Sequence, residues 1–143
     1  MISLNYLPTT AVLIQYSVMF GLVNPLERAK KLTEYWSPEV IGQVNNQYVK
    51  VAKLKGELCW HKHDNEDELF YILDGTLLIQ LENDHNVTIN TGEFYVVPKN
   101  TMHNPIANDE CLIMLVEPVS TKHTGDIQNE KTKSIEQQLR SAD

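Results

Sequence analysis

The sequence predicts a single all-β domain, a sandwich or barrel, with a short helix before it and a polar tail after it. Two patterns support this prediction. From Gln47 to Glu117, apolar residues recur with a period of two, as they do on strands that bury one face. Turn-forming pairs interrupt this stretch about every 8 to 12 residues, a spacing typical of all-β sandwiches and barrels. A chain of 143 residues is long enough for one such domain.

We divide the chain into an N-terminal extension over residues 1–23, a barrel domain with its leading helix over residues 24–125, and a polar tail over residues 126–143 that is helical or disordered. Residues 11–23 are largely apolar, but they are too few to span a membrane, which takes about 20 residues. They also lack the basic start and cleavage site of a secretory signal. The extension could form an added strand, a loosely packed helix, or a stretch upstream of a natural start at Met19.

A short helix is predicted from Asn24 to about Trp36. Asn24 can cap it, Pro25 suits the first helical position, and Glu27 can reach back to the cap. Apolar residues then recur at spacings of three and four until Pro38 ends the run. This pattern indicates an amphipathic helix that covers part of the barrel.

Eight strands are predicted between the turns. They lie near residues 47–55, 57–63, 68–73, 76–82, 86–90, 93–98, 101–107 and 111–117. The strand at 68–73 is apolar on both faces, so its outer face needs a cover. Either the N-terminal helix or a second subunit could supply that cover, and we therefore expect a homodimer as one solution.

Charge and cysteine content narrow the class of protein. The net charge is -7 and no basic stripe occurs along the chain, which argues against nucleic-acid or anionic-membrane partners. Cys59 and Cys111 lie far apart without a CxxC pair, which fits reduced thiols better than a disulfide framework. A cytoplasmic location is therefore expected.

Three histidines and one glutamate form the candidate metal site. His61 and His63 alternate at the end of a predicted strand, so both imidazoles point the same way. Glu68 opens the next strand opposite them, and His103 begins another strand that could close the set. Three neutral imidazoles and a carboxylate suit iron(II), manganese, nickel, cobalt or zinc, with coordination positions left for water or substrate.

These residues and the neighbouring glycines resemble two known motifs. Gly56, His61, His63, Glu68 and Gly75 resemble the first motif of the cupin superfamily, and Gly92, Pro98 and His103 resemble the second. Residues 24–125 also resemble small single-domain bacterial cupins, the conserved-barrel or mannose-6-phosphate-isomerase-like group. The resemblance implies an antiparallel jelly-roll barrel that binds one divalent transition metal per chain (Fe, Zn, Mn or Ni) through His61, His63, Glu68 and His103. Asn100 stands where the second motif has glycine, but asparagine tolerates a left-handed backbone well.

The candidate metal site and the resemblance to cupins are compatible with two functions. The first is a metalloenzyme that acts on a small organic molecule as a dioxygenase, lyase or isomerase. The second is a non-catalytic barrel that binds a small ligand, with an anchoring or structural metal. The inward positions of the predicted strands are mostly apolar, and few basic residues are close to the ligands, which disfavours a phosphate substrate.

Other polar residues near the motifs are interpreted as peripheral. The acidic loop at residues 66–67 is expected to be solvated rather than to bind metal. Cys59 shares the parity of the histidines and is expected to face the interior as a small hydrophobic residue. Glu57 is expected to be a solvated carboxylate at the cavity rim, with general acid–base chemistry as the weaker alternative. His85 and His123 are predicted to lie on the surface.

Overall fold

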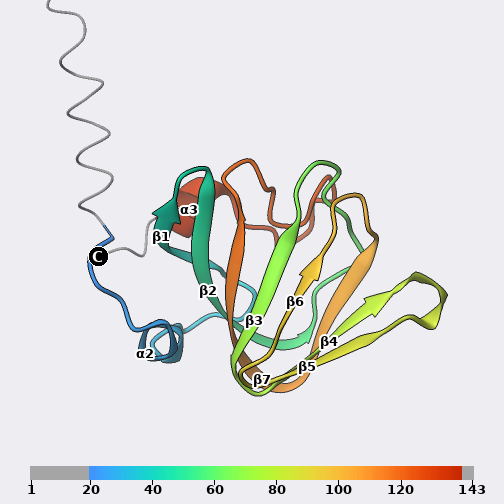
Figure 1. Cartoon of the computed structure of the whole chain (residues 1–143), viewed down its shortest axis with the longest axis horizontal. Coiled ribbons are helices and arrows are strands. Elements are labelled where there is room, and N and C mark those ends of the chain that lie inside the picture. Colours follow the sequence, from blue (N-terminus) through green and yellow to red (C-terminus); the bar gives the residue numbers. More distant parts are fainter. Residues whose placement is uncertain (1–19, 140–143) are drawn as a thin grey trace, which may run out of the picture.

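The structure is a computed structural model that describes residues 20–139. Its elements in chain order are α2 (Pro25–Lys30), β1 (Glu39–Val44), β2 (Gln47–Glu57), β3 (Glu68–Asp74), β4 (Thr76–Leu81), η2 (Glu82–Asp84), β5 (Val87–Asn90), β6 (Phe94–Val97), β7 (His103–Pro118) and α3 (Ile135–Leu139). Strands dominate, with α2 and α3 near the two ends of the described chain (Figure 1). The predicted extension over residues 1–23 lies almost wholly outside the described residues.

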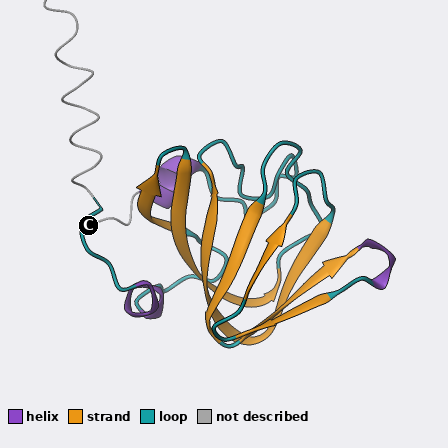
Figure 2. Cartoon of the chain, viewed as in Figure 1, coloured by secondary structure: helices purple, strands orange, loops and turns teal. Residues whose placement is uncertain are grey.

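The strands form one antiparallel sheet that curves round into a barrel (Figures 1 and 2). The main path of the sheet is β1-β2-β7-β3-β6, and β4 leaves this path by pairing with both β5 and β7. Strand β7 pairs with β3 along its C-terminal half and with β4 along its N-terminal half, so it links the two sides of the barrel. This arrangement confirms the predicted all-β, antiparallel jelly-roll fold.

Strand β7 takes the place of two predicted strands. The prediction of separate strands at 101–107 and 111–117 is wrong, because β7 runs without a break through both. Residues 108–110 are exposed, and the partner strand β2 shifts its register between Leu54 and Gly56 at the same level. Such a bulge bends both strands together. The polar residues therefore lie on the outside of a bend and do not form a turn.

The strand predicted over residues 57–63 is also wrong. Strand β2 continues through Glu57, and of the residues after it only His61 pairs, in an isolated antiparallel bridge with His103. Residues 62 and 63 have no strand opposite them, because β7 begins at His103. The two predicted ligands His61 and His63 therefore lie on a loop and not on a strand.

Strand β1 is an element that the sequence prediction lacks. It pairs with β2 from Val44↔Gln47 onward, so a two-residue connection joins the two strands. Asn45 in that connection has a φ of 50°, a conformation that asparagine adopts readily in two-residue hairpins. The hairpin adds an outer strand beside β2.

Helix α2 begins as predicted but ends early. The Asn24 side chain accepts a hydrogen bond from the Glu27 backbone N–H at 3.1 Å, and Pro25 is the first helical residue. The predicted end near Trp36 is wrong, because the helix stops at Lys30. Trp36 instead has a φ of 57° and donates its indole N–H to the Lys55 carbonyl at 2.8 Å. This docking on β2 draws the chain away from the helix axis.

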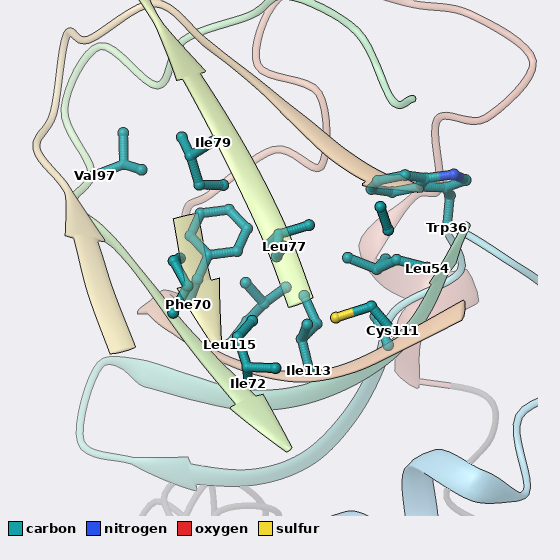
Figure 3. Packing of buried hydrophobic residues seen from close by; sticks show 13 residues of the cluster. Trp36, Leu54, Phe70, Ile72, Leu77, Ile79, Val97, Cys111, Ile113 and Leu115 are labelled. Atoms are coloured by element: carbon teal, nitrogen blue, oxygen red, sulfur yellow. The ribbon is translucent and has the colours of Figure 1, made fainter. Parts of the chain in front are cut away.

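The main hydrophobic core fills the barrel. Figure 3 shows side chains from different strands meeting in one interior, and the cluster comprises Trp36, Ala52, Leu54, Phe70, Ile72, Leu77, Ile79, Ile89, Val97, Ala107, Cys111, Ile113 and Leu115. A second cluster lies outside the sheet under α2, where Ala29, Ile41, Val51 and Leu112 are buried and Leu73 packs against them. Helix α2 therefore covers part of the outer face of β3, which is one of the two covers expected.

The polar tail folds back onto the barrel. Its described part, up to residue 139, ends in α3, where the Ser134 hydroxyl accepts from the Gln137 backbone N–H at 3.2 Å and the Gln137 side chain accepts from the Ser134 N–H at 2.8 Å. This reciprocal pair is a capping box. Gln138 of α3 is 2% exposed, so this helix does not lie free on the surface. The domain boundary at residue 125 stays a prediction.

Within residues 20–139, no helix combines the length and the apolar character that a membrane span requires.

Candidate metal centre

The four predicted ligands meet inside the barrel. His61 and His63 come from the loop between β2 and β3, whereas Glu68 and His103 are the first residues of β3 and β7. All four side chains are buried, and one potential ligand atom of each lies within 4.8 Å of those of the other three. They are the one group of this kind in the part of the chain that the structure describes.

Backbone hydrogen bonds fix the loop that carries His61 and His63. The His61 N–H donates to the His103 carbonyl at 3.0 Å, and the His103 N–H donates to the His61 carbonyl at 2.9 Å. The Asn100 N–H donates to the His63 carbonyl at 2.7 Å. Asn100 has a φ of 59°, which confirms the left-handed turn expected where the motif has glycine. The three histidines are therefore held by the backbone before any ion binds.

Two of the histidines have their tautomer set by a carbonyl. Nδ1 of His61 lies 2.9 Å from the Cys59 carbonyl oxygen, and Nδ1 of His103 lies 2.8 Å from that of Thr101. A carbonyl only accepts, so each Nδ1 carries the proton and donates it, and each Nε2 keeps its lone pair. Histidine ligands of metals are oriented by this kind of outer partner.

Several buried polar atoms at the centre have no hydrogen-bond partner. They are both ring nitrogens of His63, Oε1 of Glu68 and Nε2 of His103. Nε2 of His103 lies 3.3 Å from Oε1 of Glu68, and Nε2 of His63 lies 3.6 Å from Oε2. Buried polar atoms without partners are costly. A divalent cation would take up one ring nitrogen of His63 together with Oε1 of Glu68 and Nε2 of His103, so the residues present fit a metal ion.

The protonation states also suit a cation. Burial, together with the nearby His103, lowers the pKa of His61 to about 4, so this imidazole is neutral at neutral pH. Burial alone would raise the pKa of Glu68, but the imidazoles of His103 and His63 bring it well below its usual value. For His63, burial alone would lower the pKa, but the neighbouring Glu68 outweighs burial and raises it. Glu68 is thus ionised at neutral pH, and its negative charge favours a cation.

Sequence reasoning missed a buried ion pair beside the centre. Lys50 Nζ lies 2.7 Å from Oε1 of Glu117 and donates to Oε1 of Gln138 at 2.6 Å. Lys50 and Glu117 are 1% and 3% exposed. Burial and the neighbouring Glu68 raise the pKa of Glu117 to about 8, although Lys50 opposes this. The only signal in the sequence is that Lys50 and Glu117 sit at inward-facing positions of strands.

Several weaker predictions have clear outcomes. Neither acidic residue at 66–67 belongs to the buried group, and Asp67 instead accepts from the Lys99 N–H at 2.8 Å. Cys59 is half-buried, with Sγ 3.8 Å from Nδ1 of His61, and burial raises the pKa of its thiol. Glu57 is exposed and accepts from the Asn104 side chain at 2.6 Å. His85 is exposed as predicted.

The prediction that His123 is a surface residue is only partly right, because its side chain is half-buried. The tail returns to the barrel, and His123 lines a cavity of about 30 Å³ that also touches Glu68 and Phe70. Its Nδ1 accepts a hydrogen bond from the Lys133 backbone N–H at 2.9 Å. Burial lowers the pKa of His123 to about 4. The sequence holds no signal for this position, because it depends on the path of the polar tail.

This burial makes His123 a source of acid sensitivity. The unfolded chain binds a proton on this imidazole near pH 6.5, whereas the folded chain does so only near pH 4. The contribution of neutral His123 to the free energy of unfolding is therefore complete above pH 6.5. It is lost as the pH falls from 6.5 to about 4, by up to about 1.4 kcal/mol per pH unit. Urea unfolding of chelator-treated protein should show that wild type loses stability relative to His123→Gln over this interval. Parallel curves for the two proteins would contradict the burial of this imidazole.

Comparisons with known proteins agree with the geometry. Residues 48–117 match the Cupin domain family. A solved cupin-2 domain containing protein from Shewanella frigidimarina NCIMB 400 is 39% identical, with a TM-score of 0.65 over 68% of this chain and 94% of that one. The chain belongs to the cupin family. Within it, the mannose-6-phosphate-isomerase-like group stays a prediction.

Two further relatives of this cupin differ in what their names say. The uncharacterized protein YdbB of Bacillus subtilis (strain 168) is 33% identical over 85 residues, 59% of this chain and 75% of that protein. A 3-hydroxyanthranilate 3,4-dioxygenase 2 of Aspergillus fumigatus is 32% identical over 78 residues, 51% of this chain. This cupin matches only 40% of the length of the fungal dioxygenase.

Proposed function

We propose that this cupin binds one divalent transition metal ion per chain through His61, His63, Glu68 and His103, and that it is an iron(II)-dependent dioxygenase for a small organic molecule. The observation that carries the proposal is the buried group of three imidazoles and one carboxylate with unpartnered ligand atoms. Imidazole and carboxylate ligands together suit iron(II) and leave positions open for substrate and dioxygen. The similarity to a fungal dioxygenase supports oxygen chemistry over lyase or isomerase chemistry.

Each part of the site has a separate task in this proposal. Bound iron(II) would supply the redox chemistry with dioxygen. The carboxylate of Glu68 offsets one positive charge of the cation, and the Cys59 and Thr101 carbonyls orient two of the imidazoles. The apolar walls of the neighbouring cavity exclude bulk water from the reacting molecules.

Oxygen consumption tests the catalytic part. The protein is loaded with iron(II) without oxygen and is then mixed with dioxygen and a panel of small phenols and catechols. We expect substrate-dependent oxygen uptake that disappears in Glu68→Gln and persists in the matched variant His85→Gln, which changes an exposed residue. Iron-loaded protein that consumes no oxygen with any compound of the panel would contradict the dioxygenase assignment.

One observation favours the alternative of a non-catalytic barrel with an anchoring or structural metal. The cavity beside Glu68 measures about 30 Å³, which is room for little more than a water molecule. In that case the metal would cross-link the loop of His61 and His63 to β3 and β7. Loading with metal would then raise the melting temperature, and no compound would be turned over.

We also propose that the working unit is a homodimer in the cytoplasm. Leu69 and Tyr71 on the outer face of β3 pair with Val96 and Phe94 of β6, and Phe94 is 63% exposed. Helix α2 covers only part of the outer face of β3, and a second copy of the chain would cover the rest of this apolar face. Cys59 and Cys111 are both free thiols, as in reducing compartments. Light scattering should give a dimer mass that Phe94→Glu reduces; a monomer mass for wild type would contradict the dimer.

A further inference from the structure

The segment after β7 forms a wall of the barrel beside the metal centre. Gly125 lies against the backbone of Lys62, between His61 and His63, and a Cβ at this position would overlap the Lys62 carbonyl oxygen. Farther along, the Lys131 ammonium donates to the Glu57 carbonyl, and Gln138 accepts from buried Lys50. These contacts attach the segment at three places, two on β2 and one on the loop that carries His61 and His63.

His123 is the residue that this segment places in the cavity. The cavity is lined by Trp36, Pro38, Ala52, Leu54, Leu58, Glu68, Phe70, Pro105, Ile113, Leu115 and His123. Glu68 belongs to the proposed metal centre, so the cavity adjoins it. His123 itself is outside the group of four ligand residues. It therefore lines the cavity without belonging to the group of four.

The hydrogen bond to Lys133 determines what His123 can offer. The Lys133 backbone N–H donates to Nδ1 at 2.9 Å, and a nitrogen that accepts in this way carries no proton. In a neutral imidazole the proton must then be on Nε2. Nδ1 is turned to the backbone of the tail, and Nε2–H is left as a donor for a molecule in the cavity.

The other lining residues restrict the chemistry of that molecule. Apart from Glu68 and His123 the lining side chains are apolar or aromatic, and the indole N–H of Trp36 already donates to the Lys55 carbonyl. No lysine or arginine is among the described residues of the lining. The lining side chains thus supply no cation of their own for a carboxylate or phosphate, and they favour a neutral, mainly apolar molecule with one acceptor.

We propose that His123 is a substrate-contacting residue, whose Nε2–H donates a hydrogen bond to the acceptor atom of a small, neutral, mainly apolar molecule held next to Glu68. This inference rests on the proposed function and names its substrate class. Because the cavity measures only about 30 Å³, a molecule larger than water requires side chains of the apolar lining to move as it enters.

Phenol is a suitable probe because it is a neutral ring with one oxygen. The full-length protein, loaded with redox-inert zinc, is titrated with phenol and followed by NMR on the His123 ring nitrogens and on the methyl groups of Leu54 and Ile113, which line the cavity. We expect the Nε2-protonated tautomer of His123 before phenol is added. Saturable shifts of the His123 ring and of both methyl groups should follow as phenol binds.

Variants separate a contact from a merely structural role. His123→Leu should bind phenol about tenfold more weakly, which is the loss of one hydrogen bond, while its zinc content stays unchanged. His123→Gln keeps a side-chain N–H donor and should recover most of the affinity. His85→Leu, an exposed histidine, should behave as wild type.

Two results would overturn the inference. One is equal phenol affinity in wild type and His123→Leu, and the other is a titration that shifts neither His123 nor the cavity methyl groups. Failure of the proposed function looks different, because the protein would then take up no zinc or, when loaded with iron(II), would consume no oxygen. The response of His123 to phenol would still decide the inference in that case.

Discussion

His103→Ala is expected to lower the affinity for a divalent metal by more than about 100-fold. Loss of an outer partner of a ligand alone costs about 10- to 100-fold, and this change removes a ligand. His103 is fully buried and joins the loop of His61 to β7, so no water-exposed group can take its place. Competition with a metal-binding dye, under conditions that exclude oxygen, gives the two affinities.

The matched control is His85→Ala, which removes an exposed imidazole and should leave the affinity unchanged. Circular dichroism of the metal-free variants shows whether His103→Ala still folds. A folded His103→Ala protein that binds metal as tightly as wild type would remove His103 from the site.

Lys50→Met is expected to destabilise the metal-free protein by about 3–5 kcal/mol near pH 9, because it leaves the buried carboxylate of Glu117 without its cation. Lys50 Nζ is 2.7 Å from Glu117 and is 1% exposed, and Glu117 already has a pKa of about 8. Near pH 6 the variant can hold Glu117 neutral by keeping its proton. The loss should therefore be clearly smaller at the lower pH.

Urea unfolding at the two pH values measures this loss, with Lys55→Met as the control because Lys55 is exposed. The double variant Lys50→Met, Glu117→Leu removes both charges and should recover much of the stability. Equal stability of Lys50→Met and Lys55→Met near pH 9 would show that the ion pair contributes nothing.

The barrel is predictable from the sequence where alternation and turn residues agree. Strands β2 to β6 follow the predicted ranges closely, because each buries one face and ends at a turn signal. Residues 108–110 mislead the prediction, since exposed polar residues at a bend have the same composition as a turn. Strand β1 was missed because its residues, EVIGQV, alternate weakly and include a glycine.

The candidate site also has residues that the sequence predicts and residues that it does not. The sequence predicts His61, His63, Glu68 and His103 as a set from their types and spacing, and the structure brings them together. The reason expected for His61 and His63 does not hold, because they lie on a loop and not on a strand. The sequence does not predict His123 or the contact between Lys50 and Gln138, which lie 88 residues apart. Those positions depend on how the polar tail crosses the barrel, and no local pattern records that path.

The central claim is that the buried histidines and glutamate bind one metal ion. Elemental analysis of the untagged full-length protein, purified without chelator and without oxygen, tests this most directly. We expect about one divalent transition metal per chain, with iron as the metal if the protein is a dioxygenase. No metal, even after anaerobic reconstitution with iron, zinc, manganese and nickel, would contradict it.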